Sequence, residues 1–202
     1  MDILEELNRV HRTVREQDGV AEAPHRVQLE RTFAAAVEDV WDACTVADRL
    51  ARWFLPVTGE LRLGGHYQLE GNAGGTVREC APPSSFTVTW EYGDSTSLLT
   101  MRLTPEANIT RLQLTHSVAD DDHWRTYGPG AVGVGWDLAL LGLTAHLAAE
   151  TLPEADLAAT PEGQDFVRRS AASWGDAHAS GGAAVEQAEA AARRTSDAYA
   201  PG

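Results

Sequence analysis

The segment that most constrains the fold is GPGAVGVGWDLALLGLTAHLAAE, residues 128–150, whose pattern predicts a long helix behind a glycine-rich start. Apolar residues recur at helical spacing along two sides of this helix rather than one. A helix that is apolar on nearly every side is buried on nearly every side, so another layer of the protein must wrap around it. The two stripes are Val132, Trp136, Leu140, Leu143 and Leu147, and Val134, Leu138, Leu141, Ala145 and Ala148.

Strand-like segments precede that helix and can supply the wrapping layer. SFTVTWEY (85–92) and ITRLQLTH (109–116) alternate apolar and polar residues, as half-buried strands do. In GELRLGGHYQLEG (59–71), Gly64-Gly65 predicts a tight hairpin turn between two short strands. Short turns between successive strands favour an antiparallel meander. Further strands are expected over 27–33, 74–80 and 97–103, with short helices over 37–44 and 47–53 and an acidic loop over 118–127.

Both ends of the chain differ from this middle part. Residues 3–16 carry apolar residues at helical spacing and predict an N-terminal helix. The alanine-rich tail predicts a helix that starts at Thr160 with a threonine cap and Pro161 in first position, then a break at Gly181-Gly182 and a second helix over 183–198. The expected parts are therefore a helix in 1–20, the main domain in 25–150, and a helical extension in 151–202 that packs on the domain as a lid, clamp or dimer contact.

Charge and composition exclude several classes of function. The net charge is −14, which disfavours binding to nucleic acid or to an anionic membrane surface. All 16 basic residues are arginine, which is typical of high-GC bacterial coding and leaves no Schiff-base or phosphate-loop lysine. Cys44 and Cys80 form neither a disulfide framework nor a zinc motif. There is no signal-peptide pattern and no run of about 18 apolar residues, so we expect a cytoplasmic protein without a membrane span.

Four blocks of sequence, in order, resemble one known family. They are LERTFAAAVEDVWDACTVADRLARWF (29–54), GGTVRECAPPSSFTVTWEY (74–92), TRLQLTHS (110–117) and GWDLALLGLTAHL (135–147). Together they resemble the START-like (SRPBCC) helix-grip superfamily, in the branch named for activators of the ninety-kilodalton heat-shock protein ATPase, over about residues 26–150. The resemblance implies an α+β fold, in which a curved antiparallel sheet of six or seven strands, with two short helices after the first, grips a long C-terminal helix around a deep cavity.

The resemblance does not imply one reaction, because the superfamily includes lipid and hormone binders, polyketide cyclases, sequestering resistance proteins and chaperone-associated proteins. It does predict which residues border the cavity, and ligand pockets are mostly apolar and aromatic with a few placed polar groups. An ordinary aromatic core is the alternative interpretation. The candidate ligand-binding residues are Trp41, Trp53, Phe54, Tyr67, Arg78, Trp90, Tyr92, Met101, His116, Trp124, Tyr127, Trp136 and Leu140.

His116 is the one candidate catalytic residue. It shares a strand face with Leu112 and Leu114, so its ring should point inward, either as an acid or base or as a structural histidine. Arg78 and Glu79 are strand neighbours, so one of them should also point inward. His116, His123 and three nearby aspartates lack metal-ligand spacing. GPGAVG at 128–133 fits the letters of a dinucleotide motif but not its strand–turn–helix context. We therefore expect neither a metal nor a cofactor.

Three functions remain open at this stage. The first is binding of a hydrophobic or aromatic small molecule as a carrier, sequestering or resistance protein. The second is a polyketide cyclase-like or hydrolase-like enzyme that uses the same cavity, and the third is a chaperone-associated interaction module. The sequence leaves open the ligand, whether the cavity is open, and whether the protein forms a homodimer.

Overall fold

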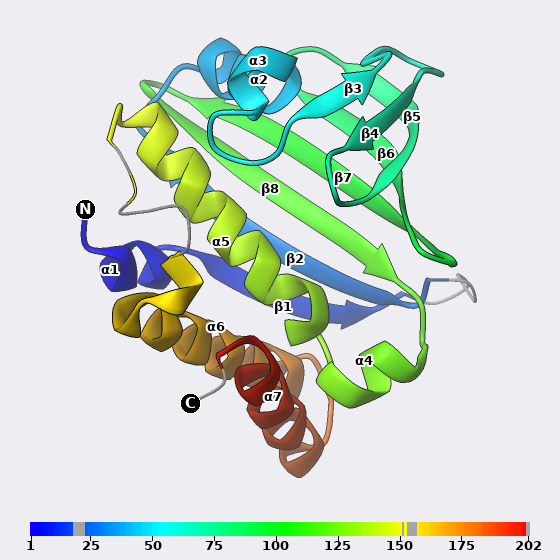
Figure 1. The fold of residues 1–202 in the computed structure, drawn as a ribbon, viewed down its shortest axis with the longest axis vertical. Coiled ribbons are helices and arrows are strands. Elements are labelled where there is room, and N and C mark those ends of the chain that lie inside the picture. Colours follow the sequence, from blue (N-terminus) through cyan, green and yellow to red (C-terminus); the bar gives the residue numbers. More distant parts are fainter. Residues whose placement is uncertain (18–22, 151, 153–156, 201–202) are drawn as a thin grey trace.

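The computed structural model describes residues 1–17, 23–150, 152 and 157–200. Its centre is one antiparallel sheet of eight strands in the order β1-β2-β8-β7-β6-β5-β4-β3. The sheet curves around helix α5, with α2 and α3 at one end of that helix and α4, α6 and α7 at the other (Figure 1). The strands are β1 (His11–Glu16), β2 (His25–Phe33), β3 (Val57–Gly59), β4 (His66–Leu69), β5 (Gly74–Ala81), β6 (Ser85–Tyr92), β7 (Ser95–Glu106) and β8 (Ile109–Val118). The helices are α1 (Ile3–Asn8), α2 (Val37–Thr45), α3 (Ala47–Leu50), α4 (Asp122–Tyr127), α5 (Gly130–Leu147), the 3-10 turn η1 (Leu157–Ala159), α6 (Pro161–Ser180) and α7 (Val185–Tyr199).

This architecture confirms the predicted α+β helix-grip fold, with eight strands in place of six or seven. Helix α5 lies in the concave face of the sheet and has buried residues on both apolar stripes. By length and composition alone α5 could cross a membrane, contrary to our expectation for this chain, but 61% of it is buried inside the fold. That burial is what the core helix of a sheet-wrapped domain requires.

The long central strands set the inner surface of the sheet. β7 and β8 pair with Leu99 opposite His116 and Met101 opposite Leu114. Because side chains alternate between faces along a strand, these residues all point toward α5. All four are buried. The alternation seen in the sequence therefore places His116 among apolar side chains.

The predicted helix over 3–16 is wrong beyond its first turns. Asp2 caps α1 with its side chain, the helix ends at Asn8, and residues 11–16 form strand β1. Val10 and Val14 lie four residues apart, a spacing that fits both a helix and every second position of a strand. The strand prevails because β1 pairs along its whole length with β2, with Val14 opposite Val27.

Two further local predictions are corrected. Gly64-Gly65 is not a two-residue hairpin, because β3 ends at Gly59 and residues 60–65 form a longer connection to β4. Gly59 has a φ of 102°, and a side chain there would overlap the backbone of His66, so this last position of β3 requires glycine. The predicted acidic loop contains helix α4, which begins where the Asp121 side chain accepts a hydrogen bond from the Trp124 backbone N–H.

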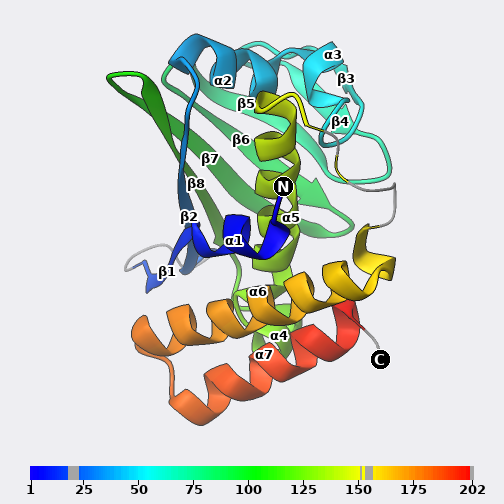
Figure 2. The ribbon, with the colours of Figure 1, turned by 90° about the vertical axis from the view of Figure 1, so that its left-hand side faces the viewer.

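Helix α6 packs against α5 and β1, and α7 packs against α6 on the side away from β1 (Figure 2). Thr160 caps α6 and Pro161 occupies its first turn, as predicted, and α6 ends before Gly181. The face of α6 that carries Phe166, Ser170 and Trp174 is buried. Trp174 is 0% exposed and lies so close to α5 that a side chain at Gly133 would overlap its ring.

A buried carboxylate joins these elements. Asp137 of α5 accepts two hydrogen bonds from Arg12 of β1, at 3.1 and 2.9 Å. It also accepts one from the Ser170 hydroxyl at 2.5 Å and one from the Trp174 indole N–H at 3.0 Å. Burial raises the pKa of Asp137, while Arg12 and the other donors act in the opposite direction. The group links β1, α5 and α6 through charge-assisted hydrogen bonds.

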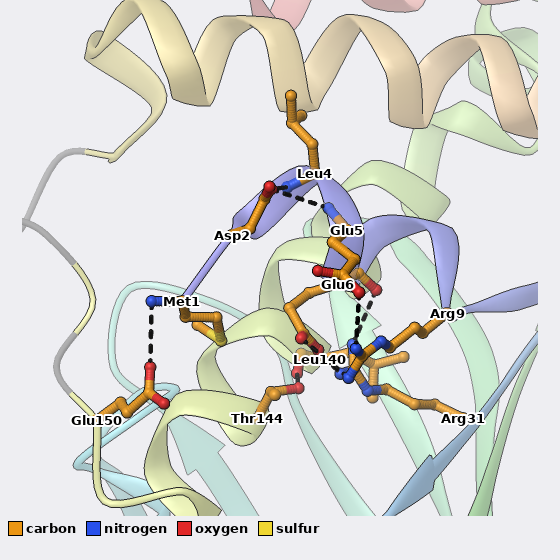
Figure 3. A network of polar contacts seen from close by, with 10 residues as sticks. All are labelled: Met1, Asp2, Leu4, Glu5, Glu6, Arg9, Arg31, Leu140, Thr144 and Glu150. Atoms are coloured by element: carbon orange, nitrogen blue, oxygen red, sulfur yellow. Dashed lines mark hydrogen bonds and ion pairs between the residues drawn. The ribbon is translucent and has the colours of Figure 1, made fainter.

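A second polar network fastens α1 beside α5 (Figure 3). The Arg31 guanidinium on β2 donates to the Glu6 carboxylate and, at 3.0 Å, to its carbonyl oxygen. Arg9 pairs with Glu5 at 2.9 Å and with Glu6 at 3.3 Å. A buried charge is costly unless it is paired. Glu6 of α1 pairs with the buried guanidinium of Arg31, and so links α1 to β2 at this edge of the core.

Candidate ligand-binding cavity

A cavity of about 290 Å³ lies between α5, the short helices α2 and α3, and the inner face of strands β3–β8. Ligand pockets typically begin at about 300 Å³, so this one suits a small apolar molecule. No charged residue lines it among the residues that the structure describes. Its lining includes the predicted residues Trp41, Trp53, Phe54, Tyr67, Trp90, Met101, Trp136 and Leu140.

Two aromatic residues of this cavity, Trp53 and Tyr67, have their polar atoms bonded within the protein. The Trp53 indole N–H donates to the Ala43 carbonyl at 2.9 Å. The Tyr67 hydroxyl donates to the Thr89 carbonyl at 2.8 Å, and burial raises the pKa of this phenol. Because these polar atoms are satisfied within the protein, the rings offer a ligand mainly their faces and edges.

A second pocket, of about 580 Å³, adjoins the first. The two share three residues, Phe54, Trp90 and Trp136. The Trp136 ring centroid lies 5.1 Å from that of Trp90 and 6.2 Å from that of Phe54. The second pocket is more polar, and its lining includes the predicted residues Tyr92, His116 and Trp124 together with Asn72, Ser95, Ser97, Asp121, His123 and Tyr199. A wall of three neighbouring aromatic rings therefore separates an apolar chamber from a mixed one.

His116 lies next to this wall, on the side of the second chamber, and both of its ring nitrogens form hydrogen bonds. The Trp136 indole N–H donates to His116 Nδ1 at 3.1 Å. Because an indole N–H can only donate, Nδ1 is the acceptor and the proton of the neutral ring is on Nε2. Nε2 lies 2.7 Å from the Ser97 hydroxyl, which donates onward to the Trp90 carbonyl at 3.1 Å. Burial lowers the pKa of His116 to about 4, so the ring is neutral at physiological pH.

This arrangement limits what His116 can do chemically. A general base needs a free lone pair within hydrogen-bonding reach of the substrate, and a general acid needs a free proton. Here the lone pair is used by Trp136 and the proton faces Ser97. The chain Trp136–His116–Ser97–Trp90 instead fixes the positions of the two tryptophans that separate the chambers.

The other predicted site residues lie apart from the first cavity. Arg78 is exposed and lines neither of these two pockets, and Glu79 is also exposed. The prediction that one of this pair points inward is wrong, because a register shift between Val77 and Glu79 interrupts the alternation of β5. Tyr127, at the end of α4, is half-buried, and its carbonyl accepts a hydrogen bond from Thr195 of α7 at 3.1 Å.

Sequence reasoning missed part of the lining. Both cysteines, Cys44 and Cys80, border the first cavity, as do several aliphatic residues of the inner sheet face. Phe86, which the alternation of residues 85–92 places on the same face as Trp90, lines it as well. Nothing in the sequence brings two cysteines 36 positions apart to one cavity. Burial raises the pKa of the Cys44 thiol to about 12, so this lining residue is a neutral thiol. Among the described residues, no group of three or more His, Cys, Asp or Glu could hold a metal ion.

The fold defines the helix-grip class, and a comparison with family models identifies the branch. Residues 34–148 match the model of the family described as activator of Hsp90 ATPase homolog 1-like protein. The match covers more than half of the chain, so the protein belongs to this family. A comparison with curated proteins found no match.

Solved structures extend the likeness beyond the family segment. The crystal structure of CalU16 from Micromonospora echinospora is 29% identical, with a TM-score of 0.69 over 83% of this chain and 97% of that one. Its solution structure gives 30% identity and a TM-score of 0.72 over 85% and 96%. A protein of unknown function from Enterococcus faecalis, EF2215, is 19% identical, with a TM-score of 0.63 over 87% and 95%, and shows likeness of fold alone.

Proposed function

We propose that this protein binds a hydrophobic or aromatic small molecule in the cavity beside α5 and acts as a cytoplasmic carrier or sequestering protein. The observation that carries the proposal is the lining of the first chamber, in which aromatic and aliphatic side chains surround about 290 Å³ without a charged residue among those described. A ligand there exchanges water for apolar contacts, which is worth about 25 cal/mol per Å² of buried surface.

The hydrogen bonds at both ring nitrogens of His116 argue against the alternative function of a polyketide cyclase-like enzyme. An enzyme that used His116 would first have to break its hydrogen bond with Trp136 or with Ser97. The chaperone-associated alternative rests on the family name, and membership of that family is compatible with binding either a small molecule or a chaperone. A protein partner of that kind needs no internal cavity, whereas a small-molecule ligand does.

Tryptophan fluorescence is the direct test, because Trp41, Trp53, Trp90 and Trp136 line the first chamber. The protein is titrated with polycyclic aromatics, fatty acids and sterols. Saturable quenching with a Kd below about 10 µM, near −7 kcal/mol, is the expected result for at least one class. A flat response to every class overturns the proposal and directs the work to chaperone partners.

A matched pair of variants on α5 shows whether the ligand occupies this cavity. Leu140 lines it, whereas Leu141 packs on the other side of α5 against Ile3, Leu7 and Phe166. Leu140→Ala and Leu141→Ala each remove the same side chain, and each should cost about 2–5 kcal/mol of stability. Only Leu140→Ala should weaken binding, by about 3–10-fold for the lost contact. Circular dichroism at the titration temperature confirms that both variants are folded.

A further inference from the structure

The second chamber differs from the first in charge as well as in polarity. Six aromatic residues line it: Phe54, Trp90, Tyr92, Trp124, Trp136 and Tyr199. One carboxylate, that of Asp121, lines it with them, and no arginine does so among the described residues. The chain has no lysine that could add a positive charge. The chamber therefore combines π faces with a negative charge.

The charge of Asp121 is not neutralised by its neighbours in the structure. Arg125, the nearest basic residue along the chain, pairs with Asp122 at 2.9 Å and with Asp120 at 3.4 Å. Asp121 Oδ1 accepts the capping hydrogen bond from the Trp124 backbone N–H at 2.8 Å. Its second oxygen, Oδ2, makes no hydrogen bond or ion pair with any described residue. The capping bond fixes the carboxylate at the pocket while one oxygen remains available.

Two of these six aromatic residues are exposed to solvent, and a third is buried. Tyr92, at the end of β6, is 63% exposed, and Tyr199 of α7 is 41% exposed. The Tyr199 hydroxyl donates to the Ala131 carbonyl at 3.2 Å, so the C-terminal helix contributes an aromatic wall to the pocket. Trp124 lies deeper, with one face stacked on His25 at a centroid distance of 4.0 Å.

We propose that the second chamber selects ligands with a protonated amine, which is held between the aromatic faces and the Asp121 carboxylate. Aromatic faces attract cations, most strongly those of tryptophan. A carboxylate with an available oxygen favours the same charge and repels an anion of the same shape. This inference rests on the proposed function, because it assigns a charge class to the ligand of the adjoining apolar cavity. The ligand class is an aromatic or apolar molecule with a basic nitrogen.

Three anthracene derivatives of nearly equal size test the charge preference. 9-(Aminomethyl)anthracene is a cation at pH 8, 9-anthracenemethanol is neutral, and 9-anthracenecarboxylate is an anion. Binding is measured by calorimetry in 150 mM salt at pH 8, where the neutral ring of His116 adds no positive charge to the pocket. The amine should bind at least about 10-fold more tightly than the carboxylate.

Two aspartate variants separate this site from the general acidity of the protein. Asp121→Asn keeps the helix cap, because asparagine caps as well as aspartate. It should reduce the affinity of the amine about 3–10-fold and leave that of the alcohol unchanged. Asp122→Asn removes the same net charge from an exposed side chain that does not line the pocket, and should change neither.

Each outcome has a separate meaning. Equal affinity for amine and carboxylate overturns the inference, as does a preference that Asp121→Asn and Asp122→Asn reduce equally. If none of the three compounds binds the wild-type protein, then the proposed function itself is wrong for this ligand class. If only the amine binds and its affinity depends on Asp121, then the charge-selecting site stands, and the effect of Leu140→Ala on the same amine shows whether its rings occupy the apolar cavity.

Discussion

Acidification provides a quantitative test of the role assigned to His116. Burial lowers the pKa of this side chain from its ordinary value of 6.5 to about 4 in the folded protein. As the pH falls below 6.5, the unfolded chain binds a proton at His116 and the folded chain does not. Protonation of His116 in the unfolded chain therefore costs the protein no stability above pH 6.5, and the free energy of unfolding decreases as the pH falls from 6.5 toward 4.

The size of the loss follows from the two pKa values. Each unit of difference is worth about 1.4 kcal/mol, and linkage gives a loss of about 2–3 kcal/mol between pH 7.5 and 4.5 from this residue alone. The ring is buried, so little of this is screened by solvent. The assay is urea unfolding followed by circular dichroism at several pH values.

Other groups also titrate over this range, so the comparison is with His116→Gln. The glutamine amide offers an acceptor oxygen for the Trp136 indole N–H and an NH2 group that can donate to Ser97, but it does not titrate. The variant should be less stable than the wild type at pH 7.5, and the gap between them should shrink by about 2–3 kcal/mol at pH 4.5. A gap that is constant with pH would refute the neutral, doubly hydrogen-bonded histidine and reopen its use as an acid or base.

Three further predictions concern packing and reactivity. Gly133→Ala should destabilise the protein by about 1–3 kcal/mol, because the added methyl group overlaps the buried indole ring of Trp174 on α6. Gly135→Ala, with open space around the added methyl group, should instead stabilise α5 by about 0.5–1 kcal/mol. Thermal unfolding measures both effects. Iodoacetamide at pH 8 should modify the exposed Cys80 and leave Cys44 intact in the folded protein, as peptide mass spectrometry would show, because burial raises the pKa of the Cys44 thiol to about 12. Removal of residues 151–202 should expose apolar surface and cause aggregation, and a truncated protein that stays monomeric in light scattering would contradict this.

The sequence predicted those parts of the fold whose signal is local and repeated. The predicted strand over 85–92 has the same bounds as β6, and Thr160-Pro161 marks the start of α6. The prediction failed where local signals were ambiguous or irregular. Val10 and Val14 fit two periods, and the pairing with β2 decides between them. The shift in β5 has no marker in the sequence, so the orientation of Arg78 could not be predicted.

The site was predictable only in its general composition. The first chamber could be anticipated from aromatic residues on the expected inner faces, since their placement follows from strand and helix periods. The second chamber was predicted only in part, through Tyr92, His116 and Trp124. Asp121 before α4 and Tyr199 of α7 were not, because these distant segments meet only in three dimensions. Likewise, the partners of Asp137 lie on β1 and α6, and no local pattern in the sequence joins them.

Adjacent residues on α5 connect the C-terminal extension to the cavity. Successive side chains of a helix point about 100° apart, so Trp136 and Asp137 necessarily face different surroundings. Trp136 forms part of the wall between the chambers and donates to His116, while Asp137 is held by Arg12, Ser170 and Trp174. With both neighbours fixed by hydrogen bonds in different directions, α5 cannot rotate about its axis without breaking one set. The helix that anchors the extension is therefore also the helix that sets the shape of the cavity.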